Sequence, residues 1–73
     1  MNSIKTIDAR GLSCPQPALL TRQALGSLDR GTVQVLVDSA TARDNVARLA
    51  EKSGWQVSIQ SQADGLFQVS LTK

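Results

Sequence analysis

Hydrophobic residues recur along this chain with two different spacings, and the spacings alternate from one segment to the next. A two-residue spacing predicts strands at residues 32–38, 55–60 and 66–72, and isoleucines support a further strand at residues 4–9. A spacing of three and four residues predicts amphipathic helices at residues 15–28 and 41–54. The predicted order is therefore strand, helix, strand, helix, strand, strand.

Local signals place the ends of several of these elements. Gly31 allows the left-handed backbone that often follows a helix. Ser39 or Thr41 can cap the start of the second helix, and Gly54 stands where that helix should stop. Between the last two strands, residues 63–65 read Ala-Asp-Gly, and the Asp-Gly pair predicts a tight hairpin.

The same alternation predicts which face of the sheet is buried. The residues expected to face the helices are Val33, Val35, Val37, Val57, Ile59, Phe67, Val69 and Leu71. The residues expected on the opposite face are Gln34, Gln56, Ser58, Gln60, Gln68 and Ser70. A sheet covered on both faces would need apolar residues at the second set. We therefore predict an α+β fold, a two-layer α/β sandwich with both helices on one face of the sheet.

The helices carry matching apolar sides. On the first helix, the residues expected to fall on one side are Pro17, Leu20, Thr21, Ala24, Leu25 and Leu28. On the second helix, the residues expected to line one face are Ala42, Val46, Leu49, Ala50 and Ser53. On the outer side of the second helix, Asp44 and Arg48 are one turn apart and are expected to pair.

Composition narrows the class of protein. The 73 residues suffice for one domain, which we predict to span 1–73, and the net charge of +2 is too small to indicate nucleic acid. No apolar run is long enough to cross a membrane or to act as a signal peptide. There is one cysteine, so no internal disulfide can form, and we expect a reducing, cytoplasmic location. There is no histidine, which argues against a zinc site and excludes a Cys–His or Ser–His nucleophile pair.

The one cysteine, Cys14, lies in the stretch GLSCPQP, residues 11–17, between the first strand and the first helix. Pro15 suits the first position of a helix, and Pro17 still falls within its first turn. A thiol at a helix start feels the positive end of the helix dipole, which is worth about 0.3–1 kcal/mol at the surface and up to ~2 kcal/mol when partly buried. We therefore expect the pKa of Cys14 to fall by up to roughly one unit from about 8.5. The alternative is that Cys14 is a small buried hydrophobic residue.

In the stretch DARGLSCPQP the chain resembles the TusA/SirA family of small sulfur-carrier proteins. The matching positions are Asp8, Gly11, Leu12, Cys14, Pro15 and Pro17. The likeness extends along the whole chain and looks closest to the N-terminal, TusA-like domain of YedF proteins, which carry a second domain. Whether the chain is one domain excised from such a longer protein is open.

The resemblance implies a fold, an activity and partners. The fold is an α/β sandwich with a mixed sheet of strand order 1-2-4-3. The activity is to hold sulfane sulfur as a persulfide on Cys14, with no cofactor other than this transient group. The partners are a cysteine desulfurase or other persulfide donor and a downstream acceptor protein. Such a carrier is consumed and regenerated once in each transfer, so it is a stoichiometric participant. We expect it to act as a monomer and to bind neither nucleic acid nor a membrane.

The remaining motif residues have a structural and a functional interpretation each. Asp8 either orients the loop through hydrogen bonds or is a solvated carboxylate at a strand end. Arg10 could help to stabilise the Cys14 thiolate, and Gly11 is expected to serve backbone geometry. Leu12 is expected to contribute to packing rather than to partner contact.

Two residues of the first helix are candidates for docking a partner. Leu19 falls outside the apolar side of the helix, one turn beyond Cys14, and Arg22 lies near it. A single exposed leucine is ordinary, and Arg22, like Arg43 and Arg48, is otherwise a solvated helix position. Together, Leu19 and Arg22 could form a docking patch around the thiol.

Two other classes of function compete with sulfur carriage. A nucleic-acid-binding module would show salt-dependent RNA binding that survives Cys14→Ser, but the chain has no aromatic and basic interleaving. A scaffold or regulatory domain would keep its function in Cys14→Ser and lose it through changes at Leu19 or the sheet face. A third alternative keeps Cys14 as the reactive group, but the protein then carries selenium or exchanges disulfides instead of carrying sulfur.

Overall fold

The computed structural model describes residues 4–12, 16–28 and 30–73. Along the chain its elements are β1 (Ile4–Asp8), α1 (Gln16–Gly26), β2 (Thr32–Val37), α2 (Ala40–Lys52), β3 (Gln56–Ser61), a short 3-10 turn (Ala63–Gly65) and β4 (Phe67–Thr72). Each of the six predicted elements is present, with ends that differ by one or two residues.

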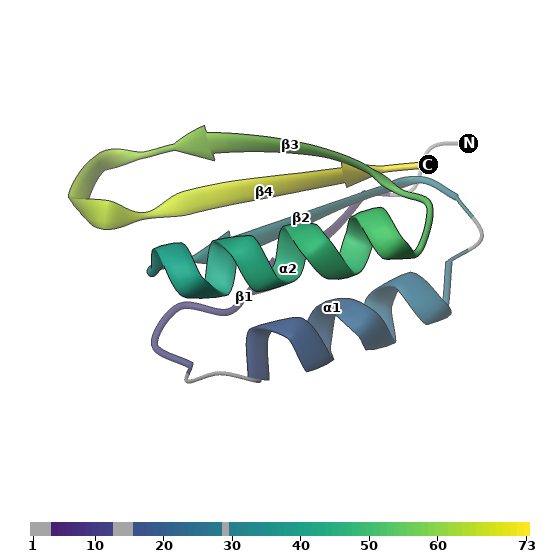
Figure 1. The fold of residues 1–73 in the computed structure, drawn as a ribbon, viewed down its shortest axis with the longest axis horizontal. Coiled ribbons are helices and arrows are strands. Elements are labelled where there is room, and N and C mark those ends of the chain that lie inside the picture. The colour runs from purple at the N-terminus through teal and green to yellow at the C-terminus, as the bar shows by residue number, and fades with distance from the viewer. Residues whose placement is uncertain (1–3, 13–15, 29) are drawn as a thin grey trace.

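The four strands form one mixed sheet in the order β1-β2-β4-β3. β1 and β2 run parallel, whereas β4 pairs antiparallel with both β2 and β3. Both helices lie on one face of this sheet, so the molecule has two layers (Figure 1). α1 packs against β1 and β2, and α2 packs against β3 and β4. This confirms the predicted α+β sandwich and its strand order.

The core lies between the sheet and the helices, as the alternation of residue types requires. In β2 every second residue is buried, and β4 supplies Val69 and Leu71 from the neighbouring strand. The buried hydrophobic residues are Ala9, Ala24, Leu25, Val33, Val35, Val37, Ala42, Val46, Ala50, Trp55, Val69 and Leu71. Trp55 is the only tryptophan in the sequence, so its fluorescence can report on unfolding of this core.

Specific hydrogen bonds form at the predicted start of α2 and in the predicted hairpin. Ser39 is the N-cap of α2, and its hydroxyl accepts the backbone N–H of Ala42. In the hairpin between β3 and β4, Asp64 and Gly65 both have positive φ, at 63° and 75°. The N–H of Leu66 closes this turn onto the carbonyl of Ala63. Two central residues with positive φ are what a type I′ hairpin turn needs, so Asp-Gly was the correct signal.

Three expectations about the helices and strands need correction. α1 ends at Gly26 rather than Leu28, because the N–H groups of Ser27 and Leu28 bond three residues back and tighten the last turn. Ile59 was expected in the core, but it is 43% exposed because β3 is the outer strand of the sheet. Asp44 pairs with its neighbour Arg43 at 3.0 Å instead of with Arg48.

The face of the sheet opposite the helices is polar, as predicted. The exposed or half-buried residues that it presents include Gln34, Gln56, Ser58, Gln60, Gln68 and Ser70. Leu36 of β2 also lies on this face and is half-buried, in register with Gln68. No helix in the described part of the chain has the length and apolar character needed to cross a membrane.

Candidate functional site

The candidate site is at the edge of the sheet where β1 and β2 end. Because these strands run parallel, their carboxyl ends meet at the same edge. The described starts of α1 and α2 lie at that end of the molecule too (Figure 1). Residues that follow β1 and β2 are therefore brought together although they are far apart in sequence.

A tight turn at residues 9–12 leads the chain out of β1. Ala9 is buried, and its N–H donates to the carbonyl of Leu36 at 2.8 Å. The N–H of Leu12 then bonds the carbonyl of Ala9 at 3.4 Å, and Gly11 has a φ of 76°. A positive φ at the third position is the mark of a type II turn, which favours glycine there. A Cβ at Gly11 would meet no other atom within 4 Å, so backbone conformation, and not space, requires the glycine.

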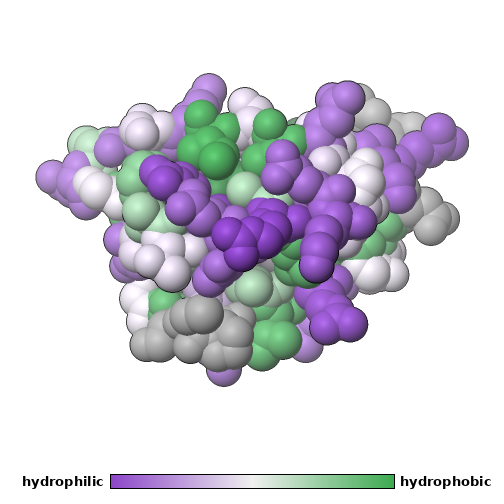
Figure 2. Space-filling model, viewed as in Figure 1, coloured by the Kyte–Doolittle hydropathy of each residue, from purple (hydrophilic) through white to green (hydrophobic). Residues whose placement is uncertain are grey.

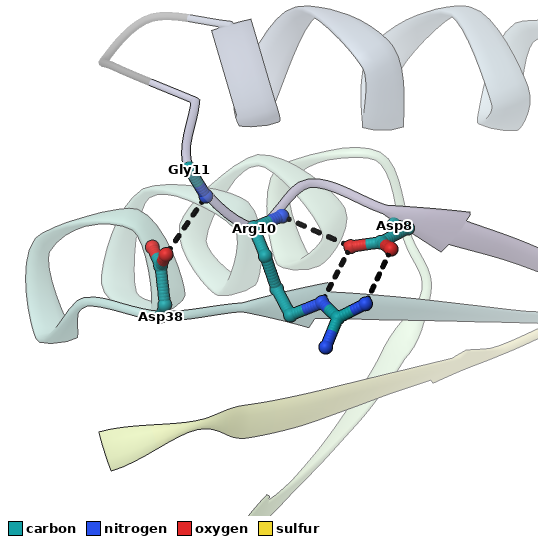
Figure 3. A network of polar contacts seen from close by, with 4 residues as sticks. All are labelled: Asp8, Arg10, Gly11 and Asp38. Atoms are coloured by element: carbon teal, nitrogen blue, oxygen red, sulfur yellow. Dashed lines mark hydrogen bonds and ion pairs between the residues drawn. The ribbon is translucent and has the colours of Figure 1, made fainter. Parts of the chain in front are cut away.

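Asp8 and Arg10 form an ion pair at the start of this turn. The Arg10 side chain donates to both carboxylate oxygens of Asp8, at 2.9 and 2.8 Å, and the Arg10 N–H donates to one of them at 3.2 Å (Figure 3). The side-chain bond, followed by the backbone bond, lowers the pKa of Asp8 from 3.8 to about 2. The same bond raises the pKa of Arg10 above its usual value. The positive charge of Arg10 is therefore compensated by Asp8. A role for Arg10 in stabilising the thiolate stays a prediction, because Cys14 lies outside the described residues.

A second carboxylate holds the turn from the other strand. Asp38 follows β2 directly, and its Oδ2 accepts the backbone N–H of Gly11 at 2.7 Å (Figure 3). The bond joins residues 27 positions apart in the sequence. The turn is thus fixed to the ends of both strands, by Asp8 on its own strand and by Asp38 on the neighbouring one.

The described part of α1 is held firmly from its first residues. Pro17 is buried, and its carbonyl accepts the hydroxyl of Thr21 at 2.9 Å. Thr21 is completely buried and is the only buried polar residue found among the described positions. The hydroxyl satisfies its own hydrogen-bonding need within the helix, which explains how a polar residue fits the apolar side.

Cys14 and Pro15 lie outside the described residues. In the sequence, Cys14 is two positions after Leu12 and two before Gln16. The described residues on either side are the fixed turn and the first turn of α1. Both ends of the chain segment that carries the thiol are therefore well held.

The predicted docking residues are at the surface. Leu19 is 43% exposed, and Arg22, the only charged residue of α1, is exposed as well. Leu12 is 38% exposed, so the expectation that it contributes to packing was wrong. It follows a turn whose anchored residues are Ala9 and Gly11. Figure 2 shows a small hydrophobic patch at the lower edge of the molecule, where α1 lies, with hydrophilic residues beside it.

The comparisons with known proteins agree with this architecture. The family model described as sulfurtransferase TusA matches residues 5–73. The chain belongs to the TusA sulfurtransferase family. A candidate sulfur carrier protein of Methanocaldococcus jannaschii is 32% identical to it over 72 residues, which cover 97% of this chain and 96% of that protein. The crystal structure of a SirA-like protein from Desulfitobacterium hafniense matches with a TM-score of 0.89 and 36% identity, covering 96% of each chain.

In this TusA-family chain, the sequence motif identifies the residues of the turn after β1 but not the residue that contacts the turn from β2. Its residues Asp8, Gly11 and Leu12 lie in or beside the turn, but Asp38 was missed because it is outside the motif. One signal could have revealed it. Parallel β1 and β2 bring the residue that follows each strand to the same edge, and Asp38 directly follows β2.

Among the residues that the structure describes, no three His, Cys, Asp or Glu side chains gather closely enough to hold a metal ion. Asp8 and Asp38 are each engaged in hydrogen bonds of the turn. Their arrangement shapes the backbone that leads to the thiol.

Proposed function

We propose that this protein is a sulfur carrier that holds sulfane sulfur as a persulfide on Cys14 and relays it to an acceptor protein. Membership of the TusA sulfurtransferase family and a sulfur carrier among its relatives support this role. The observation that carries the proposal is the anchoring of the described residues on both sides of Cys14. Gly11 is bonded to Asp38, and buried Pro17 fixes the first turn of α1.

The transfer requires only thiol chemistry. The Cys14 thiolate attacks the terminal sulfur of a donor persulfide, a new S–S bond forms, and the donor leaves as a thiolate. An acceptor thiolate then attacks the terminal sulfur on Cys14, and Cys14 leaves as a thiolate. The sulfane sulfur changes carrier without net oxidation or reduction. Neither step needs a histidine, and the sequence contains none.

A single cysteine favours a carrier over a redox enzyme. A second thiol near a persulfide would attack it, form an internal disulfide and release the cargo. The sequence has no second cysteine, so a persulfide on Cys14 could leave only to another molecule. Persistence of a lone thiol also fits a reducing compartment, and we propose the cytoplasm.

The donor and acceptor are proteins that dock on α1 and the turn before it. Leu12 and Leu19 are exposed leucines on these two segments, and Arg22 adds a positive charge. A partner with an apolar contact ringed by carboxylates would complement them. We propose a cysteine desulfurase, or another protein persulfide, as the donor.

The test is intact-mass analysis of the purified protein after incubation with a cysteine desulfurase and free cysteine. We expect a gain of one sulfur atom that a thiol reductant removes and that Cys14→Ser does not acquire. Inorganic polysulfide provides a second donor that needs no protein docking. The two donors together separate a thiol that cannot take sulfur from one that does not meet the chosen desulfurase.

Other results would contradict the proposal in distinguishable ways. If Cys14 reacts with iodoacetamide but takes sulfur from neither donor, selenium carriage or disulfide exchange replaces it. If Cys14 resists alkylation in the folded protein, the thiol is structural and the domain is a scaffold. Salt-dependent RNA binding that persists in Cys14→Ser would identify a nucleic-acid-binding module.

A further inference from the structure

We infer that Asp38 is a positioning residue for sulfur transfer, which rests on the function proposed above. Its carboxylate accepts the Gly11 N–H at 2.7 Å and so ties the turn before Cys14 to the end of β2. Asp38 lies outside the DARGLSCPQP motif. It acts through the backbone and not on the sulfur itself.

The chemistry of the bond suits a positioning role. Hydrogen bonds to an ionised acceptor are shorter and roughly twice as strong as neutral ones. At 2.7 Å the contact between Gly11 and Asp38 has the length expected of this class. Gly11 has a φ of 76°, a conformation that its local sequence alone does not enforce, because glycine also adopts negative φ readily. Asp38 stabilises the one conformation in which the Gly11 N–H points to β2.

The bonds within the turn do not replace this contact. Asp8 and Arg10 are two residues apart, so their pair closes the turn on itself without fixing it to a second strand. The bond from the Leu12 N–H to Ala9 is long, at 3.4 Å. Of the side-chain contacts made by residues 8–12, the one with Asp38 is the contact that spans two strands. The backbone bond from Ala9 to Leu36 holds only the start of the turn, so loss of the Asp38 contact would let residues 10–12 shift relative to α1.

Two substitutions at Asp38 separate the hydrogen bond from the charge. Asp38→Ala removes the acceptor. Asp38→Asn keeps a carbonyl oxygen at nearly the same place but removes the charge. The matched control is Asp44→Ala, since Asp44 is an exposed aspartate whose side chain bonds its surface neighbour Arg43. The control removes the same charge away from the turn.

The experiment measures single-turnover sulfur uptake from a persulfidated cysteine desulfurase, together with hydrogen exchange at the Gly11 amide by NMR. We expect Asp38→Ala to accelerate Gly11 exchange and slow uptake about tenfold, because misplacing a reacting group by ~1 Å can cost roughly a hundredfold. Asp38→Asn should recover uptake to within about threefold of the unchanged protein, and Asp44→Ala should match it. Alkylation of Cys14 by iodoacetamide should change little in any variant, since a small reagent needs no docked geometry.

The inference is overturned if Asp38→Ala takes up sulfur as fast as the unchanged protein, or if Asp38→Asn is as slow as Asp38→Ala although its Gly11 amide exchanges as slowly as in the unchanged protein. The second result would assign the effect to charge. If the unchanged protein takes up no sulfur, the proposed function is wrong, and the role of Asp38 in sulfur transfer is then wrong too. Exchange at Gly11 then still decides whether Asp38 holds the turn.

Discussion

Arg10 reaches back two residues and donates from Nε and Nη2 to the two carboxylate oxygens of Asp8, at 2.9 and 2.8 Å. Both side chains are about half exposed, so the pair is screened by solvent and contributes little to global stability. Its consequence is local. The pair and the bond from the Arg10 N–H close the backbone between β1 and Gly11 into a single conformation.

The first prediction concerns the acid titration of Asp8. Its pKa of about 2 in the folded protein is below the ordinary value of 3.8. A group with a lowered folded-state pKa stabilises the fold above its unfolded-state pKa, and this contribution is lost as the pH falls from 3.8 toward 2. In Arg10→Gln the main cause of the shift is gone, so the pKa of Asp8 should rise toward 3.8.

Carboxyl-carbon NMR can follow this titration directly. Arg43→Gln serves as the control, because Arg43 pairs with Asp44 and should leave Asp8 unchanged. A value near 3.8 for Asp8 in the unchanged protein would show that the pair with Arg10 does not form in solution.

Much of the fold could be predicted from the sequence because its information is local and periodic. Alternating valines in residues 32–38 identify a strand buried on one face, and Asp64 with Gly65 encode the hairpin turn. Ile59 shows where such reasoning stops. The alternation gives the face on which a residue lies, but its burial there depends on how far α2 extends over the outer strand.

The site was less accessible to sequence reasoning, for the same kind of reason. The motif indicates Asp8 and Gly11 because they are close to Cys14 in the chain. Asp38 is 27 residues from Gly11, and only the parallel pairing of β1 and β2 brings it near. Leu12 was assigned to packing from its residue type, whereas the turn leaves it exposed.

The second prediction compares two glycines. Gly11→Ala should destabilise the protein by about 1–2 kcal/mol, because an L-residue at positive φ is strained. An added Cβ would meet no atom within 4 Å at either Gly11 or Gly26, so steric overlap does not contribute. Gly26 ends α1 with ordinary helical geometry, and Gly26→Ala should stabilise by about 0.5 kcal/mol.

Urea unfolding monitored by Trp55 fluorescence measures both changes. Trp55 is buried in the core, so its fluorescence reports on loss of the folded core in both variants. Equal effects of the same sign would mean that the backbone of the turn is not held at positive φ.

The third prediction tests the buried hydroxyl of α1. Thr21→Val keeps the shape of the side chain but removes the bond to the Pro17 carbonyl, and it should cost about 1 kcal/mol. Thr41→Val changes the same group at an exposed position of α2 and should stay within roughly 0.5 kcal/mol of zero. Thermal unfolding by circular dichroism would measure both. If Thr21→Val stabilises the protein, burial of the methyl group outweighs the lost hydrogen bond.

The last prediction concerns docking on α1, where hydrophobic contact and charge should separate experimentally. Leu19→Ala removes an exposed apolar side chain, and Arg22→Glu reverses the only charge on the helix. Both side chains are exposed, so each variant should keep its stability within about 0.5 kcal/mol. Each should slow sulfur uptake from a protein donor about fivefold or more at limiting donor concentration. Arg22→Glu should also weaken or abolish the slowing of uptake by added salt, whereas Leu19→Ala should preserve it.

Arg48→Glu, an equivalent charge reversal on the outer side of α2, is the matched control and should behave as the unchanged protein. Uptake from inorganic polysulfide should be the same in all of them, since that donor needs no docking surface. If Arg48→Glu is impaired and Arg22→Glu is not, the donor approaches over α2, and the surface formed by Leu12, Leu19 and Arg22 is not the one it uses.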